Sequence, residues 1–457
     1  LPNSLGEPAA ELVAAGDHRD SLQAFGRQQP RQDHRQQAVR EIVADLQAPR
    51  PMLRLLQGDV GSGKTLVALL ALVHVMENGH QGVLMAPTEI LARQLFANAK
   101  RYVEPLGLTV GLLVGSMSAA QKAKLKQHVK EGFVNLLVGT HAVVQDDVVF
   151  DKLGLAVIDE QHRFGVRQRM ALSANSKLPP DILVMTATPI PRTLALTVYG
   201  DMDVSMLRAK PPGRTPIKTV VLQDGRMDEV VQGIGRVLQA GQQVYWVCPL
   251  VEENEDSDLT AATQRAEHLK GVYGKVVGLL HGKMKAADKD AVMARFVAGE
   301  VKILVSTTVI EVGVDVPNAS LMVIDHAERF GLSQLHQLRG RVGRGAAASS
   351  CVLLYSTPLT PYAQERLEAL RQSDDGFYLA EKDLELRGPG EVLGTKQAGD
   401  VAMRLADLHH HRDLLPVARD VAQGLLAANL SSAQRGALTL LLQMFDKSAA
   451  AEFLRGG

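Results

Sequence analysis

Residues Gly58–Thr65 read GDVGSGKT, which fits the pattern G-x-x-x-x-G-K-[ST] of a phosphate-binding loop. An apolar run that begins at Met52 precedes the loop and an apolar helical stretch follows it, so the motif has the strand–loop–helix context that it requires. Its glycines let backbone N–H groups curl around phosphate oxygens, Lys64 supplies a cation to the β- and γ-phosphates, and the Thr65 hydroxyl can bind Mg²⁺. The residues that we expect to bind ATP and Mg²⁺ are Gly58, Gly61, Ser62, Gly63, Lys64 and Thr65.

Short apolar runs separated by helical stretches continue along the chain in two series. Runs of this kind are typical of buried parallel strands with helices on both faces of the sheet. The stretch PPGRTPIK, Pro211–Lys218, interrupts the pattern and is expected to link the two series. The sequence thus predicts an α/β fold with two tandem, doubly wound parallel sheets. The strand-like runs begin at Met52, Gly82, Asn135, Leu155 and Ile182 in the first series and at Gln243, Val276, Lys302, Leu321 and Cys351 in the second.

These features divide the 457 residues into four parts. Residues 1–50 are polar and form an N-terminal linker with one amphipathic helix at Gln36–Leu46. Residues 51–210 form the first lobe, which carries the phosphate-binding loop, and residues 211–360 form the second. Residues 361–457 comprise a charged segment with a helical pattern, a glycine-rich stretch and amphipathic helices.

Composition excludes several classes of protein. Lys plus Arg and Asp plus Glu are 50 each, so a histone-like or tail-driven nucleic-acid binder is disfavoured. The two cysteines, Cys248 and Cys351, cannot build a zinc site and are expected to be buried thiols. The longest apolar run, Thr65–Met76, is interrupted by His74 and too short for a membrane span. No leader opens the chain, so we expect a cytoplasmic protein without a membrane partner; Leu1 in place of Met suggests that a segment was removed upstream.

The run LGLAVIDE, Leu153–Glu160, places two carboxylates at the end of a buried strand in the lobe that carries the loop. Asp159 is suited to hold Mg²⁺ and Glu160 to orient or deprotonate the attacking water. We expect Glu160→Gln to keep nucleotide binding and lose turnover.

The second series has no phosphate-binding loop of its own, but QLRGRVGRG, Gln337–Gly345, places Arg341 and Arg344 three residues apart. On a helix this spacing directs both guanidiniums to one face. We interpret them as arginine fingers that act on a nucleotide held by the first lobe, a contribution of about 10³ to 10⁵ in rate. Hydrolysis of ATP would then depend on closure of the two lobes.

The order of further motifs resembles superfamily 2 helicases, with RecA-like lobes, and most closely the RecG family of branch-migration helicases. The strings in helicase order are APTEILARQ (Ala86–Gln94), GTHA (Gly139–Ala142), DEQHRFGV (Asp159–Val166), TATPIPRT (Thr186–Thr193), LLHGKM (Leu279–Met284) and TTVIEVGVDVPNA (Thr307–Ala319). The segment Arg366–Gly399 is similar to the translocation motif that this family shares with the transcription-repair coupling factor. The resemblance covers about Pro51 to Gly399.

The resemblance implies roles for further residues. Gln337, with Arg341 and Arg344, would sense the nucleotide, and Gly313 and Asp315 would border its cleft. Residues that would face DNA or couple it to ATP are Thr88, Arg93, Thr140, His141, His281 and Thr307. Gln161 and His162 would relay between the lobes, and Arg366, Arg387 and Gln397 would link lobe motion to movement of DNA.

The chain departs from the family pattern in two respects. The adenine-reading glutamine has three candidates, Gln32, Gln36 and Gln37, without a clean match. Nothing resembles the N-terminal wedge domain that splits branched DNA, so the chain is expected to be the isolated motor, active on ATP but poor at remodelling forks.

The sequence therefore predicts an ATP-dependent DNA helicase motor for branch migration and fork reversal in recombination and repair. Its expected partners are branched or forked DNA, held by the duplex arms, and the single-stranded-DNA-binding protein, with a monomer as the expected state. Aromatic residues are only 4% of the chain, which favours tracking by phosphate contacts over stacking on bases. Alternatives are a duplex translocase of the transcription-repair coupling type, a nucleotide-switched DNA-binding module, and an RNA helicase.

Overall fold

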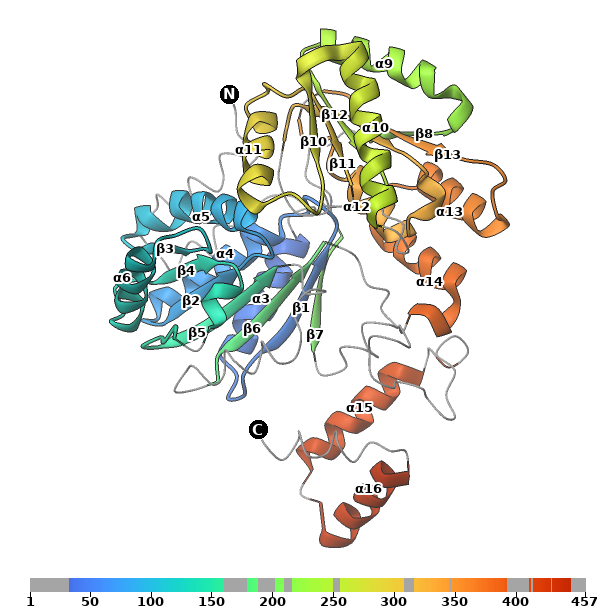
Figure 1. Cartoon of the computed structure of the whole chain (residues 1–457). Coiled ribbons are helices and arrows are strands. Elements are labelled where there is room, and N and C mark those ends of the chain that lie inside the picture. The colour runs from blue at the N-terminus through green and yellow to red at the C-terminus, as the bar shows by residue number, and fades with distance from the viewer. Residues whose placement is uncertain are drawn as a thin grey trace. The chain divides into compact units, whose positions relative to one another are not determined.

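The protein is described by a computed structural model that covers residues 33–145, 147–159, 179–187, 202–208, 216–249, 255–307, 316–345, 347–392, 411, 414–428 and 430–444. The chain divides into two compact units. One comprises residues 1–189 and 203–383, and the other residues 190–202 and 384–457. The first unit contains both sheets (Figure 1).

The first sheet has, within the described residues, seven strands in the order β3-β4-β2-β5-β6-β1-β7, and all of their pairings are parallel. The strands are β1 (Leu53–Gly58), β2 (Gln81–Met85), β3 (Val110–Leu113), β4 (Leu136–Gly139), β5 (Leu153–Asp159), β6 (Asp181–Thr186) and β7 (Asp203–Leu207). The five strands predicted for the first series are present. The two edge strands, β3 and β7, were not predicted.

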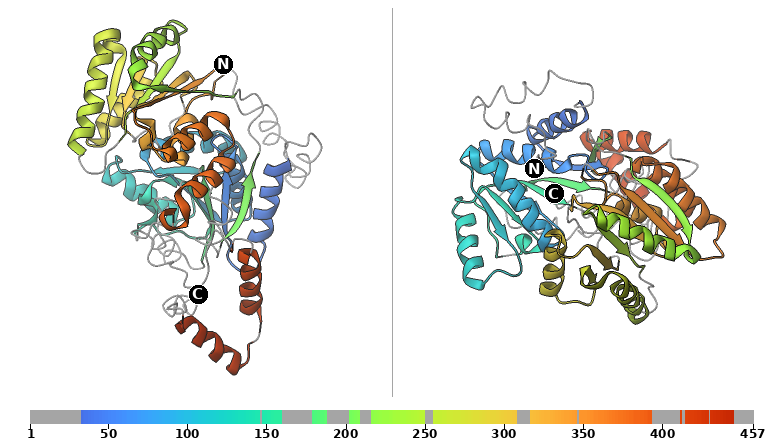
Figure 2. Two further views of the ribbon diagram at one scale, coloured as in Figure 1. Left: turned by 90° about the vertical axis from the view of Figure 1, so that its right-hand side faces the viewer. Right: turned by 90° about the horizontal axis from the view of Figure 1, so that it is seen from above.

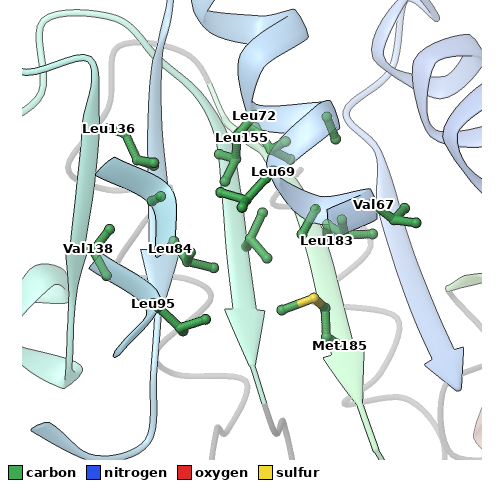
Figure 3. Packing of buried hydrophobic residues seen from close by; sticks show 14 of the residues in the cluster. Val67, Leu69, Leu72, Leu84, Leu95, Leu136, Val138, Leu155, Leu183 and Met185 are labelled. Atoms are coloured by element: carbon green, nitrogen blue, oxygen red, sulfur yellow. The ribbon is translucent and has the colours of Figure 1, made fainter. Parts of the chain in front are cut away.

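Helices pack on one face of this sheet to form its main core. They are α3 (Asp33–Leu46), α4 (Lys64–Glu77) and α5 (Glu89–Val103), and α6 (Ala119–Lys130) lies next to β3. Figure 3 shows Val67, Leu69 and Leu72 of α4 packed over side chains of the strands. Because α3 shares this core, the predicted amphipathic helix belongs to the packing of the first sheet.

Arg54, the second residue of β1, connects α3 to the sheet. Its guanidinium Nε lies 2.6 Å from Asp45 Oδ2, and its Nη1 lies 3.2 Å from Glu41 Oε2 and 2.9 Å from Ser205 Oγ of β7. The Arg54 side chain is only 10% exposed, whereas the two carboxylates on α3 are about a third exposed. This cluster therefore fixes the helix whose first turn reaches the phosphate-binding loop.

We expect Arg54→Ala to lower the free energy of unfolding by about 2–3 kcal/mol, because two carboxylates lose their shared cation and α3 loses its anchor. Urea unfolding followed by circular dichroism measures this loss. Arg226→Ala, which breaks an exposed ion pair with Glu229, is the control and should leave the midpoint unchanged. Equal midpoints for Arg54→Ala and wild type would show that α3 is held by its apolar face alone.

The second sheet has, in the described part of the chain, six parallel strands in the order β10-β11-β9-β12-β13-β8. They are β8 (Lys218–Gln223), β9 (Gln243–Val247), β10 (Val277–Leu280), β11 (Ile303–Ser306), β12 (Ala319–Ile324) and β13 (Ser350–Tyr355). The five predicted strands are present, and β8 is an additional edge strand that begins at the last residue of the predicted linker. The two sheets confirm the predicted fold class.

Side chains alternate across the second sheet and build a core on each face. On β9, Val244 and Trp246 join one core, whereas Tyr245 and Val247 join the other. The first core is covered by α9 (Met227–Gln239) and α10 (Glu255–Tyr273). The other is covered by α11 (Ala286–Val297), α12 (Leu332–Arg339), α13 (Pro361–Gln372) and the start of α14 (Gly376–Val392) (Figure 2). The second unit contributes α15 (Leu414–Ala427) and α16 (Ser432–Met444).

Both cysteines are buried and free, as predicted. Burial raises the pKa of the Cys248 thiol and of the Cys351 thiol to about 12, so neither forms a thiolate near neutral pH. None of the helices described is both long and apolar enough to cross a membrane.

Candidate nucleotide site and its links to the second sheet

The phosphate-binding loop connects the end of β1 to the start of α4 through left-handed glycines. Gly61 has a φ of 78° and Gly63 a φ of 96°, a region that favours glycine. A Cβ atom on Gly58 would lie 2.4 Å from Ser62 Oγ, so the loop closes tightly on itself. Glycines in this conformation let the backbone N–H groups of such a loop turn toward an anion in front of the helix N-terminus.

Two side chains of the loop fit a bound triphosphate. Lys64 is buried, and its Nζ donates to the carbonyl oxygens of Gly58 at 2.7 Å and Asp59 at 3.1 Å. Ser62 Oγ is buried and has no hydrogen-bond partner. Phosphate oxygens could accept a hydrogen bond from the unpaired Ser62 hydroxyl and could also bind the Lys64 ammonium at the N-terminus of α4.

The predicted Mg²⁺ ligands lie on elements of the same sheet. Thr65 is in the first turn of α4 and Asp159 is the last residue of β5, at the carboxyl edge where parallel strands place their ligand sites. No group of three or more His, Cys, Asp or Glu side chains that could hold a metal occurs among the residues with described positions. One hydroxyl and one carboxylate suit Mg²⁺, which takes its remaining ligands from phosphates and water. Glu160 lies outside the described residues.

The two arginines are not on a helix, so the predicted shared helix face is wrong. Helix α12 ends at Arg339, and Gly343 adopts a left-handed φ of 76° between Arg341 and Arg344. The glycines break the helix that the three-residue spacing requires. Arg344 Nε instead donates to the carbonyl oxygen of Gly340 at 3.3 Å.

Arg341 and Arg344 both lie close enough to the buried ring of Tyr245 on β9 for their charges to act on it. Burial raises the pKa of Tyr245 to about 12, and the positive charges of Arg341 and Arg344 act in the opposite direction. Gln337, the third predicted residue of this motif, lies on α12.

Helix α12 touches the phosphate-binding loop directly. His336 Nε2 lies 2.8 Å from Asp59 Oδ1, and both side chains are nearly buried. A Cβ on Gly340 would lie 3.1 Å from Val60 Cγ2, so the backbone at the end of α12 is also against the loop. Sequence reasoning missed Asp59 and His336, because residues 277 positions apart carry no local sign of their contact.

Arg35 is a third residue that sequence reasoning missed. It lies on the first turn of α3, and its Nε donates to the carbonyl oxygen of Ser62 at 2.9 Å. A Cβ on Gly63 would lie 2.9 Å from the same Nε, so the guanidinium packs against the loop. Burial lowers the pKa of Arg35, which nevertheless stays protonated near neutral pH. Of the candidate adenine readers, Gln37 pairs with Glu41 on the exposed side of α3, and Gln32 lies outside the described residues.

We expect Arg35→Met to weaken ATP binding about tenfold, because the loop loses a charge-assisted hydrogen bond that holds its backbone in place. The dissociation constant of a fluorescent ATP analogue measures the change. Arg40→Met, on the exposed side of the same helix, is the matched control and should bind as wild type does. Unchanged binding by Arg35→Met would assign Arg35 to packing only.

Residues predicted to face DNA in the first lobe follow two adjacent strands. Thr88 follows β2 and accepts a hydrogen bond from the Leu91 amide, so it caps α5. Arg93 pairs with Glu89 at 2.7 Å and remains about half exposed. After β4, Thr140 is buried and His141 is exposed. Since β2 and β4 pair in parallel, both segments leave the sheet at the same edge.

The second lobe repeats this arrangement with His281 and Thr307. They follow β10 and β11, whose last residues, Leu280 and Ser306, are paired in register. His281 Nδ1 and Thr307 Oγ1 are both buried without a hydrogen-bond partner. Burial lowers the pKa of His281, with Lys289 and Lys283 acting in the same direction, which favours a neutral ring. The structure thus brings two unsatisfied polar groups together at this edge.

Arg366 holds a turn of the second lobe. Its Nη1 donates to the carbonyl oxygen of Phe330 at 2.6 Å and its Nη2 to that of Glu328 at 2.8 Å, while the guanidinium stacks on Tyr362. These contacts indicate that Arg366 positions the backbone of the turn that contains Glu328 and Phe330. Arg387 lies on α14. The predicted residues that lie outside the described ones, besides Glu160, are Gln161, His162, Gly313, Asp315 and Gln397.

Comparison with known families assigns three consecutive regions. The family model for DEAD/DEAH box helicases matches residues 33–197, and that for the helicase conserved C-terminal domain matches residues 225–346. A third model, described as ATP-dependent DNA helicase RecG, domain 3, C-terminal, matches residues 373–447.

Similar proteins agree with these matches. The ATP-dependent DNA helicase RecG of Acidithiobacillus ferridurans is 54% identical over 400 residues, which are 87% of this chain and 58% of that protein. Its counterpart from Escherichia coli K12 is 52% identical over 84% of this chain and 56% of its own length. The chain therefore spans a little over half the length of these relatives.

Solved structures give the same result. A structure of RecG bound to a three-way DNA junction superposes with a TM-score of 0.72 and 39% identity, over 90% of this chain and 56% of that one. Saccharomyces cerevisiae Dbp5 bound to RNA and ADP BeF3 superposes with a TM-score of 0.58 and 16% identity, over 84% of this chain and 97% of that one, which is a likeness of fold alone.

Proposed function

The chain belongs to the RecG type of helicase, and from this premise we propose that it is the ATP-dependent DNA motor of a helicase for branch migration and fork reversal. The observation that carries the proposal is the contact between the two sheets at the phosphate-binding loop, where α12 places His336 2.8 Å from Asp59. The segment that follows α12 carries Arg341 and Arg344, which are the groups needed to complete a site on the first sheet.

In this proposal the first sheet holds the nucleotide and the second completes its site. Lys64 and the loop amides bind the phosphates of ATP, and Thr65 with Asp159 would hold Mg²⁺. When bound, Mg²⁺ would neutralise charge on the phosphate oxygens. Glu160 orients the attacking water, and Arg341 and Arg344 stabilise the charge that develops on the transferred phosphoryl group. Gly313, Asp315 and Gln337 line the same site in this proposal.

We propose that DNA is bound at the C-terminal ends of the strands in both sheets and moves when the distance between the sheets changes. Thr88, Arg93, Thr140 and His141 leave the first sheet at one edge, and His281 and Thr307 leave the second in the same way. The residues of each lobe contact DNA phosphates, so a change in the distance between the lobes moves one set of phosphate contacts relative to the other. Gln161 and His162 relay the change, and Arg366, Arg387 and Gln397 transmit it to the translocation segment.

We also propose a substrate, an oligomeric state, a compartment and a partner for the motor. The substrate is branched or forked DNA held by its duplex arms, the motor acts as a monomer in the cytoplasm, and the single-stranded-DNA-binding protein is its partner. We also propose that the chain divides into four parts at residues 50, 210 and 360. The match to RecG domain 3 does not favour a transcription-repair translocase.

The test is the rate of ATP hydrolysis with forked DNA, linear duplex, single-stranded DNA or RNA, at about 50 and 200 mM salt. We expect forked and duplex DNA to stimulate hydrolysis far more than RNA, and the stimulation to fall at the higher salt because phosphate contacts release counterions. Lys64→Ala is the inactive control. A rate that no DNA stimulates would instead support a nucleotide-switched binding module, and greatest stimulation by RNA would support an RNA helicase.

A further inference from the structure

A chain of hydrogen bonds begins at the phosphate-binding loop and continues beyond it into the second lobe. His336 Nε2 lies 2.8 Å from Asp59 Oδ1, and its Nδ1 lies 3.0 Å from Arg339 Nη2. Because an arginine side chain only donates hydrogen bonds, Nδ1 must accept, and the ring proton lies on Nε2. His336 is therefore a neutral ring that donates to the loop carboxylate and accepts from Arg339 on the same helix.

Arg339 carries the chain to the helices that follow the second sheet. Its Nη1 donates to the carbonyl oxygen of Leu370, near the end of α13, at 2.6 Å and lies 3.2 Å from Asp374 Oδ1. The Arg339 side chain is only 2% exposed, inside an apolar core to which Leu335 and Leu338 belong. A second bond from α12 joins Ser333 Oγ to Asp383 Oδ2 of α14 at 3.0 Å.

We infer that His336 and Arg339 form a positioning relay that couples the phosphate-binding loop to the start of the translocation segment, through Asp374 between α13 and α14. The inference rests on the proposed function, because it assigns a path by which ATP at the phosphate-binding loop and DNA at the translocation segment, Arg366–Gly399, affect each other. Neither residue touches the nucleotide in this scheme.

The chemistry of the relay makes it a two-state element. The neutral ring can satisfy Asp59 and Arg339 only while α12 stays against the loop. If the loop retreats with its nucleotide, Nε2 loses its acceptor in a buried site, and an unpaired buried donor is costly. Movement of the loop is thus opposed unless α12, and with it Arg339 and the α13–α14 junction, follows. Coupling between sites of this kind is typically 5-fold to 150-fold.

Two substitutions of His336 separate the two contacts. In His336→Gln the side-chain amide can occupy the place of Nε2 and keep the contact with Asp59, but it cannot reach Arg339 as well. In His336→Asn the amide occupies the place of Nδ1 and keeps the contact with Arg339 only. The relay requires both contacts, so both variants should lose about tenfold in the ratio of DNA-stimulated to basal ATP hydrolysis. Full stimulation in either variant would overturn the relay.

Asp374→Asn tests the far end at a residue distant from the nucleotide. Its side chain is about a third exposed, so the variant should fold, and its basal turnover and KM for ATP should match wild type while stimulation by forked DNA falls about tenfold. Glu365→Gln, which removes the same charge from the exposed side of α13, is the matched control and should keep full stimulation. A merely structural Asp374 would lower the unfolding midpoint and leave the ratio unchanged, which would contradict the relay.

The relay and the proposed function fail in different ways in this experiment. If forked DNA does not stimulate wild type, the proposed function is wrong and the relay falls with it. If wild type and all three variants are stimulated equally, the motor stands and the relay is wrong.

Discussion

Arg344→Ala should lower the turnover number for ATP hydrolysis about 10³-fold or more, with little change in the affinity for ATP. In the proposed mechanism the Arg344 guanidinium, supplied by the segment that follows α12, stabilises charge that develops only in the transition state. Arg344 Nε is held by the carbonyl oxygen of Gly340, and Gly340 packs against Val60 of the phosphate-binding loop. The measurement is single-turnover hydrolysis with saturating ATP and forked DNA, together with the dissociation constant of an ATP analogue.

Two variants make this result specific. Arg344→Lys keeps the charge but not the planar fork, and it should recover only a small part of the lost rate. Arg295→Ala removes an exposed arginine of the same lobe that pairs with Glu300, and it should hydrolyse ATP as wild type does. A loss for Arg344→Ala of less than about tenfold would contradict its assignment as an arginine finger.

Glu160→Gln should bind ATP normally and hydrolyse it about 10² to 10⁴ times more slowly. Glu160 directly follows Asp159, the last residue of β5 and a proposed Mg²⁺ ligand. The amide keeps the size of the side chain and one acceptor oxygen, but its NH₂ group donates hydrogen bonds and it cannot take a proton from water. Equilibrium binding and steady-state hydrolysis in the same buffer separate the two steps.

The control for this substitution is Glu104→Gln on the surface of the first lobe, where the carboxylate pairs with Lys100. It should leave both binding and hydrolysis unchanged. Equal hydrolysis by Glu160→Gln and wild type would remove Glu160 from the mechanism, and the water would then have to be oriented by another group.

The strands that were missed in the sequence lie at the edges of the two sheets, where β10 was the one edge strand predicted among the described residues. Interior strands such as β2 are buried on both faces, so they read as continuous apolar runs. The missed strands β3, β7 and β8 are all at sheet edges. In β8, KTVVLQ, no residue is fully buried, and a strand with one protected side has no need of a long apolar run.

The site was predictable where its chemistry is local and not where it depends on distant residues. GDVGSGKT fixes its own turn, strand and helix, and the structure agrees with that prediction. The spacing of Arg341 and Arg344 suggested a helix, but glycines at 340 and 343 end it. The contacts of Asp59 with His336 and of Arg35 with Ser62 join separate elements, and no pattern within either segment predicts them.

The most direct test of the shared nucleotide site is a crystal structure of the chain with forked DNA and ADP–beryllium fluoride, a mimic of ATP. We predict that Lys64 Nζ and the Arg344 guanidinium contact the same fluoride group, with His336 still bonded to Asp59. A structure in which the mimic is bound by the loop while Arg344 contacts no atom of it would contradict the account.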